Sequence, residues 1–123
     1  MEKVGILHPG MMGIYVAASV IKSGYELFWA SEGRSEATKQ RAESHRLQDL
    51  EQLEYLCRKC QILISVCPPH AALDMARQVA ALSFNGLYLD ANAISPGTAG
   101  DIETLFKNSD IVFVDGGIIG RPE

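Results

Sequence analysis

Two glycines three positions apart, Gly10 and Gly13, follow a short apolar run in the stretch KVGILHPGMMG. In the G-x-G-x-x-G pattern of dinucleotide-binding proteins, the second glycine lets the backbone approach a pyrophosphate and the third lets a helix pack closely on a strand. The amides of Met11 and Met12 would face that pyrophosphate at the positive end of the helix. The spacing therefore predicts a phosphate-binding turn. A plain strand-to-helix turn would account for two glycines as well.

The first position of this pattern, which normally holds the glycine of the turn, is His8. Pro9 stiffens the turn that a glycine would have permitted. The imidazole of His8 has two interpretations, a donor to a phosphate or ribose oxygen and a turn residue that faces solvent, and we favour the second. The cofactor contacts expected in this turn are His8, Pro9, Gly10, Met11, Met12 and Gly13.

The next expected strand, YELFWA, ends without a carboxylate. Proteins that prefer NAD usually carry an acid there to accept hydrogen bonds from the ribose, whereas the 2′-phosphate of NADP calls for arginine and small polar groups. Ser31, Arg34 and Ser35 follow this strand, so we expect NADP as the cofactor and regard NAD as less favoured. Glu32 is the counter-argument, because its carboxylate lies nearby and could serve a ribose. The stretch is also consistent with a polar loop in which Ser35 caps the next helix.

Strands and helices alternate along the chain. Short apolar runs predict strands at residues 3–7, 25–30, 61–66, 86–90 and 110–117. Helical patterns lie between them, the clearest at residues 70–82, where Leu73, Ala76, Val79 and Ala80 share one face. Residues 47–60 are expected to form a short extended piece that leads into a helix. This alternation predicts an α/β fold, a Rossmann-type doubly wound and mostly parallel sheet in a single domain.

Composition limits the range of partners. The 123 residues suit one domain, and 47% hydrophobic and 21% charged residues are ordinary for a globular protein. A net charge of −4 provides no basic excess, so we expect no nucleic acid and no membrane as partners. The amino-terminal residues lack the features of a secretory signal, and no apolar run approaches the roughly 20 residues of a membrane span. We expect a cytoplasmic protein, a homo-oligomer that acts on a small-molecule substrate.

The cysteines could form a chemical site of their own. Cys57 and Cys60 form a C-x-x-C pair, which is typical of redox centres and of half a zinc site. No second pair or close histidine pair completes a tetrahedral set, so we interpret both as core side chains and expect no metal. An odd count of three cysteines is typical of a reducing compartment.

Four segments together resemble a known family. VGILHPGMMG, SVCPPHAAL, DANAISPGT and FVDGGIIG are similar, in this order, to segments of the N-terminal domain of β-hydroxyacid dehydrogenases, which include 6-phosphogluconate and 3-hydroxyisobutyrate dehydrogenases. The resemblance implies that the second segment lies along the nicotinamide half of the cofactor and the third on the substrate side. The further cofactor contacts that it implies are Cys67, Pro68, Pro69, Asn92 and Ala93, and the substrate side includes Asn92 and Ile119.

Some residues depart from the family pattern. Asn92 and Ala93 stand where the family has Ser-Thr, and Ile119 stands where it has a substrate-contacting serine. These changes remove hydroxyls that would bind a hydroxy-acid carboxylate. They disfavour a standard small hydroxy acid as the substrate and indicate a divergent branch of 6-phosphogluconate-dehydrogenase-like proteins.

The resemblance implies a catalytic lysine outside the residues given. In the family this general acid/base lies on a helix of a second, helical domain, and the context of Lys107, the last lysine here, does not match it. We therefore identify no catalytic residue. We expect residues 1–123 to be the NADP-binding domain of a longer oxidoreductase or of a truncated relative, inactive in isolation. The alternative is a non-catalytic nucleotide-binding or interaction module.

Overall fold

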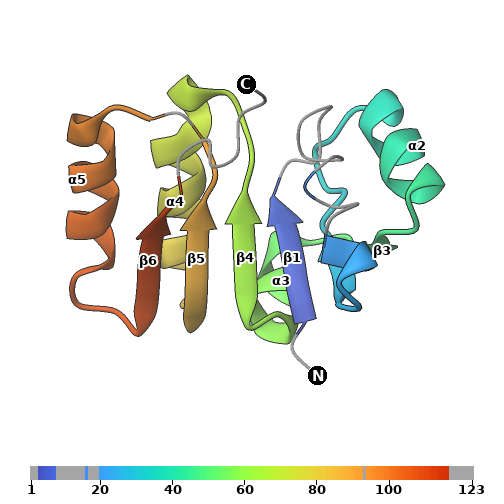
Figure 1. The fold of residues 1–123 in the computed structure, drawn as a ribbon, viewed down its shortest axis with the longest axis horizontal. Helices are drawn as coiled ribbons and strands as arrows, with labels where there is room; N and C mark the ends of the chain where they lie inside the picture. Colours follow the sequence, from blue (N-terminus) through green and yellow to red (C-terminus); the bar gives the residue numbers. More distant parts are fainter. Residues whose placement is uncertain (1–2, 8–15, 17–19, 93, 117–123) are drawn as a thin grey trace.

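The computed structural model describes residues 3–7, 16, 20–92 and 94–116. They form one six-stranded sheet in the order β3-β2-β1-β4-β5-β6 (Figure 1). The strands are β1 (Lys3–Leu7), β2 (Glu26–Trp29), β3 (Gln48–Asp49), β4 (Ile62–Ser65), β5 (Gly86–Asp90) and β6 (Ile111–Asp115). All neighbouring strands are parallel. The predicted Rossmann-type doubly wound fold in a single domain is confirmed, and the described part of its sheet is entirely parallel.

Helices connect these strands. They are α2 (Glu36–Ser44), α3 (Leu53–Lys59), the short 3-10 helix η1 (Pro69–Ala71), α4 (Ala72–Ala81) and α5 (Pro96–Phe106). Residue 16 and residues 20–22 are also helical. No helix in the described ranges is long and apolar enough to cross a membrane.

Serine caps determine where two helices begin. The Oγ of Ser35 accepts a hydrogen bond from the amide of Thr38 at 3.2 Å, and the Oγ of Ser95 accepts one from Thr98 at 3.1 Å. Such a cap satisfies an amide that has no partner within the helix and contributes about 1 kcal/mol. Ser35 thus has the N-cap role that the sequence predicts. Gly24, with φ +92°, ends the preceding helix in a conformation that favours glycine.

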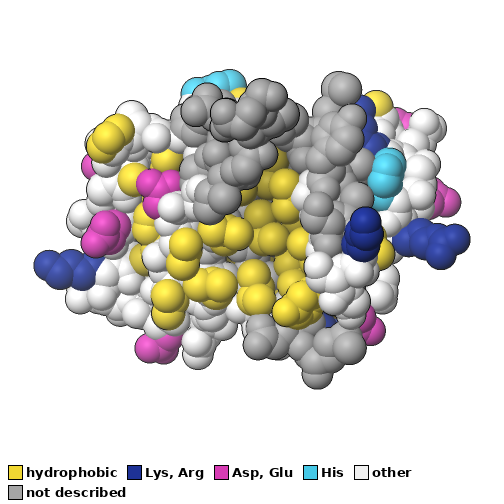
Figure 2. Space-filling model, in the orientation of Figure 1, with side chains coloured by type: hydrophobic (Ala, Val, Ile, Leu, Met, Phe, Trp, Pro, Cys, Tyr) yellow, Lys and Arg dark blue, Asp and Glu magenta, His cyan; other side chains and the backbone are white. Residues whose placement is uncertain are grey.

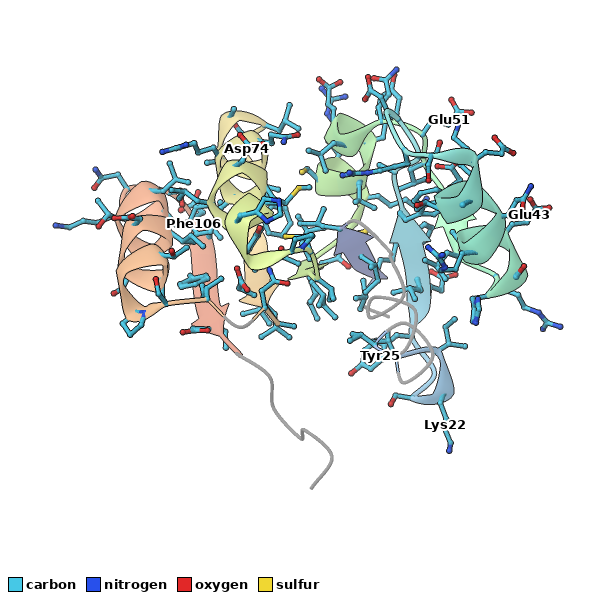
Figure 3. The ribbon with its side chains drawn as sticks, turned by 90° about the horizontal axis from the view of Figure 1, so that it is seen from above. Lys22, Tyr25, Glu43, Glu51, Asp74 and Phe106 are labelled. Atoms are coloured by element: carbon cyan, nitrogen blue, oxygen red, sulfur yellow. The ribbon has the colours of Figure 1, made fainter. Side chains whose placement is uncertain are left out.

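Successive side chains of the central strands pack into two apolar layers. Leu63 of β4 and Tyr88 of β5 belong to the layer that α3, α4 and α5 cover, whereas Ile64 belongs to the layer on the other face. Seen from above, α4 with Asp74 lies on one side of the sheet and Tyr25 on the other (Figure 3). Burial on both faces explains why β4 is a continuous apolar run in the sequence.

The order of the strands reverses next to β1. The chain goes from β1 to β2 and β3 on one side, and returns to β4, β5 and β6 on the other. Leu7 pairs with Ser65, and Ser65 pairs with Asp90, so the loops after β1, β4 and β5 start side by side at one edge of the sheet. Ligands of open α/β sheets bind at this edge, near the reversal.

Candidate nucleotide-binding site

A cavity of about 300 Å³ lies at this edge, between the ends of β1 and β2 and the helices α3 and α4. Its lining combines apolar side chains with charged groups from the loop after β2. The lining residues are Ile6, Leu7, Ala30, Glu32, Arg34, Leu53, Leu56 and Gln78. Pockets with apolar walls and a few polar groups are typical of small-molecule sites. Glu32 and Arg34 therefore line the same cavity. In the sequence, Arg34 favours NADP and Glu32 favours NAD.

Hydrogen bonds fix the backbone of the loop after β2. The Oδ1 of Asp49, at the end of β3, accepts from the amides of Ser31 at 3.1 Å and Glu51 at 2.7 Å. The amide of Glu32 donates to the carbonyl of Glu51 at 2.8 Å, and the amide of Arg34 donates to the carbonyl of Ser31 at 3.0 Å. The backbone of this loop, which carries Glu32 and Arg34, is therefore held in place by hydrogen bonds. Sequence reasoning did not single out Asp49, although an aspartate that binds the amide two residues on is a common turn signal.

Ser35 lies next to Arg34 and begins α2. Its Oγ accepts from the amide of Thr38, and it is 3.0 Å from the Oγ1 of the same residue. The hydroxyl of Ser35 thus acts as the N-cap of α2. The positive end of this nine-residue helix starts at the same loop.

The loops after β4 and β5 are joined by buried polar contacts. Asn92 is only 4% exposed, and its side chain points inward. Its Oδ1 accepts from the amide of Cys67 at 2.7 Å, and its Nδ2 donates to the Oγ of Ser65 at 3.2 Å. Cys67 is half-buried and Pro68 exposed, and Pro69 begins η1. The structure thus brings Cys67 and Asn92 together, and the side-chain amide of Asn92 faces the protein.

Burial disfavours charge on the acid that supports Asn92. Asp90 is fully buried, and this raises its pKa; the hydrogen bond from the amide of Asn92 opposes the shift, while nearby Asp115 adds to it. Its Oδ1 accepts from the amide of Asn92 at 2.8 Å. Burial also raises the pKa of Tyr88 and of Cys67. In all three groups burial thus disfavours the charged form relative to the same group in water.

The C-x-x-C pair is part of the core. Cys57 and Cys60 are buried free thiols, which confirms their interpretation as core side chains. Burial raises the pKa of Cys57 to about 11 and that of Cys60 to about 12. Thiols with such pKa values are poor nucleophiles near neutral pH. Among the described residues, no group of three or more His, Cys, Asp or Glu side chains could hold a metal ion.

Several predicted site residues are outside the described ranges. They are His8, Pro9, Gly10, Met11, Met12, Gly13, Ala93 and Ile119. Lys107 follows the last turn of α5, roughly 16 Å along the helix from its first residue, because each residue of an α-helix adds about 1.5 Å. It is therefore at the opposite end of α5 from the loop after β5.

Almost the whole chain matches the model of a known protein family. Residues 3–123 match the family described as the NAD binding domain of 6-phosphogluconate dehydrogenase. The chain belongs to this family. As a member of the 6-phosphogluconate dehydrogenase NAD-binding family, it is a nucleotide-binding domain.

Individual relatives agree with this assignment. The "uncharacterized 28.5 kDa protein in 7S RNA 5′ region" of Methanothermus fervidus is 33% identical over 100 residues, which are 81% of this chain and 39% of that protein. A conserved protein of unknown function, whose structure is described as similar to 3-hydroxyacid dehydrogenases, superposes with a TM-score of 0.82 at 30% identity, over 92% of this chain and 42% of the other.

A more distant structure shows the same fold. The 3-hydroxyisobutyrate dehydrogenase of Mycobacterium tuberculosis, solved with L-serine, gives a TM-score of 0.80 at 18% identity, over 95% of this chain and 42% of the other. The chain thus spans about two fifths of the length of each of these three proteins.

Proposed function

We propose that this chain binds NADP and forms the cofactor domain of an oxidoreductase that transfers hydride between NADP and a hydroxy acid or a related small substrate. The observation that carries the cofactor choice is the position of Arg34 on the cavity lining, beside a strand that ends at Trp29 and is followed by Ala30 rather than by an acid. A guanidinium binds a phosphate with charge-assisted hydrogen bonds, which are about twice as strong as neutral ones.

The cavity fits the adenosine end of such a cofactor. Its apolar walls, which include Ala30, Leu53 and Leu56, suit the faces of a purine. In this proposal Arg34, on the same lining, binds the 2′-phosphate. In this proposal the pyrophosphate lies on the turn that contains Gly10 and Gly13, as the sequence pattern predicts. The nicotinamide extends past the loop after β4.

In this proposal the bound cofactor would donate or accept the hydride, and the chain supplies binding and orientation. The residues of the loop after β2 select the ribose, and those after β4 and β5 hold the backbone on which the nicotinamide would rest. The proton-transferring lysine belongs to the second, helical domain that the family resemblance implies. The isolated 123 residues should therefore bind the cofactor without turning over a substrate.

NAD is the second candidate cofactor, and a specific observation favours it. Glu32 lines the same cavity as Arg34, and its carboxylate could accept hydrogen bonds from the two hydroxyls of an unphosphorylated ribose. Titration of the protein with NADPH and with NADH separates the two candidates. Tighter binding of NADPH supports the proposal, tighter binding of NADH supports the alternative, and binding of neither would contradict both and leave a non-catalytic interaction module.

The proposal includes self-association through an open face of the sheet. Leu87 pairs with Val112, and Leu89 pairs with Val114, so these four side chains share one face of β5 and β6. Val112 is 61% exposed and Val114 40% exposed. Figure 2 shows hydrophobic side chains gathered on this side of the molecule. Parallel sheets are normally covered on both faces, and a second copy would cover this one.

The remaining expectations concern partners and location. We propose a small-molecule substrate and a cytoplasmic protein without nucleic-acid or membrane partners, since the net charge of −4 favours neither surface. Recovery of the native protein in the soluble cytoplasmic fraction, free of nucleic acid, would test this part.

A further inference from the structure

The side chain of Asn92 is committed to contacts inside the protein. Its Oδ1 accepts from the amide of Cys67 at 2.7 Å, and its Nδ2 lies 3.2 Å from the Oγ of Ser65 and 3.5 Å from the Sγ of Cys67. Both hydrogens of the amide and one acceptor site are thereby used. Because only 4% of its surface is exposed, Asn92 presents almost no polar surface to a substrate.

Asn92 is itself held by the end of β5. Its backbone amide donates to the Oδ1 of buried Asp90 at 2.8 Å, and the amide of Ile94 donates to its carbonyl at 3.0 Å. The carbonyl of Asp90 accepts from the amide of Gly116 at 2.8 Å. The residue that reaches the loop after β4 is therefore anchored on a strand of the sheet rather than on another loop.

The bond to Cys67 crosses between two loops that are far apart in the sequence. The two residues are separated by 25 positions, and Asn92 contacts both Ser65, the last residue of β4, and Cys67 just beyond it. One side chain thus fixes the direction in which the chain leaves β4. Without it, the amide of Cys67 would lose its partner at a half-buried position, and the loop would have to find another conformation.

We propose that Asn92 is a positioning residue, which holds the backbone at Cys67 in the conformation that accepts the nicotinamide half of the cofactor, and is not a ligand of the substrate. This inference rests on the proposed function, because the nicotinamide position is part of it. A loop that is ordered before binding costs less free energy on binding, so the effect of Asn92 falls on the half of the cofactor that touches this loop.

Two ligands distinguish binding at the adenosine end of the site from binding at the nicotinamide end. Adenosine 2′,5′-bisphosphate occupies only the adenosine end, whereas NADP⁺ occupies both ends. For Asn92→Ala we expect the Kd of NADP⁺ to rise roughly tenfold, as for the loss of a typical hydrogen bond, while the Kd of adenosine 2′,5′-bisphosphate stays within about twofold. Ser65→Ala, which removes one acceptor of the Nδ2, should shift the same ratio in the same direction by less.

Ser95→Ala is the matched control. Ser95 lies three residues after Asn92 and caps α5, and its side chain bonds to Thr98 rather than to the loop after β4. It should lower the melting temperature while leaving the ratio of the two Kd values at its wild-type level. An Asn92→Ala variant that weakens both ligands equally would overturn the inference, because a merely structural role has that effect.

A cofactor-free measurement keeps the inference separate from the proposed function. In folded Asn92→Ala, the amide hydrogen of Cys67 should exchange with solvent faster than in the wild type, because its acceptor is gone. Unchanged exchange at Cys67 would overturn the inference whatever the protein binds. Faster exchange in a protein that binds neither ligand would confirm that Asn92 holds the amide of Cys67. It would contradict a role of Asn92 in nicotinamide binding and, with it, the proposed function.

Discussion

The carboxylate of Asp49 accepts a hydrogen bond from the backbone amide of Ser31 at 3.1 Å, which ties the end of β3 to the loop after β2. The same Oδ1 accepts from Glu51, whose carbonyl in turn accepts from the amide of Glu32. Because these bonds order the loop in the absence of a ligand, little ordering is required on binding. Under the proposed function, we expect the choice between NADP and NAD to depend on the side chains of Glu32 and Arg34, which line the same cavity.

The first prediction concerns Arg34. Arg34→Ala should remove most of the preference for NADPH over NADH, because a charge-assisted contact with the 2′-phosphate is worth on the order of 1.5 to 3 kcal/mol. The affinity for NADH should change little. Calorimetric titrations of the wild type and the variant with NADPH and with NADH measure the difference in affinity.

Glu32→Gln is the control for this prediction, since it alters a second charged residue on the same cavity. It should leave the affinity for NADPH within about twofold or increase it, because a carboxylate near a phosphate is repulsive. Equal affinity of the wild type for both cofactors, or a large loss of NADH binding in Glu32→Gln, would instead support NAD.

The second prediction concerns the glycine turn of the sequence. Gly10→Val should abolish binding of both cofactors, because a branched side chain would occupy the space that the pyrophosphate needs. His8→Gly restores the usual residue of the pattern and should be tolerated. Circular dichroism establishes that both variants fold, and undiminished affinity in folded Gly10→Val would refute the expected phosphate position.

The fold was predictable because local signals along the chain agree with one another. The apolar run of β4, the cap at Ser35 and the glycine at position 24 each indicate the boundary or the type of an element. The start of the last helix, α5, also follows from local signals. It begins at Pro96, because Ser95 caps it and a proline is well suited to the first helical turn.

The site was less predictable, because its geometry depends on partners far apart in the sequence. The resemblance places Asn92 beside the cofactor, but the direction of its amide is set by Cys67 and Ser65 on another strand end. Likewise, the role of Asp49 depends on Ser31, which is 18 residues away. Such contacts follow from strand order and register, and neither spacing nor composition reports them.

The third prediction concerns the pH dependence of stability. Burial raises the pKa of Asp90 in the folded state, so between its unfolded pKa and this raised value the folded state binds more protons than the unfolded state. The contribution of Asp90 to stability is therefore fully present below the unfolded pKa and is lost as the pH rises through the folded one. Asp90→Asn removes this loss, so its stability relative to the wild type should increase from pH 4 to pH 7 in thermal melts.

Asp101→Asn is the control for the removal of one negative charge, because Asp101 is exposed on α5. It should not reproduce the trend of Asp90→Asn. The asparagine at position 90 can still accept from the amide of Asn92, so the fold should survive. A relative stability that falls or stays level as the pH rises would mean that Asp90 is not disfavoured as a charged group.

The last prediction concerns self-association. Val112 and Val114 leave an apolar strip on β6 with α5 on the opposite side of the sheet, and burying this strip against a second copy would remove apolar surface from water. The 123-residue chain should therefore form a dimer whose population rises with concentration.

Replacing both valines with threonine keeps the β-branched shape but adds hydroxyls, and should raise the dimer dissociation constant at least about tenfold, or about 1.4 kcal/mol. Sedimentation velocity at several concentrations measures this, with Tyr55→Gln, an exposed aromatic residue on α3, as the control that should leave the dimer intact. A wild-type chain that stays monomeric throughout, or a dimer that the two threonines do not weaken, would show that β6 is not the interface.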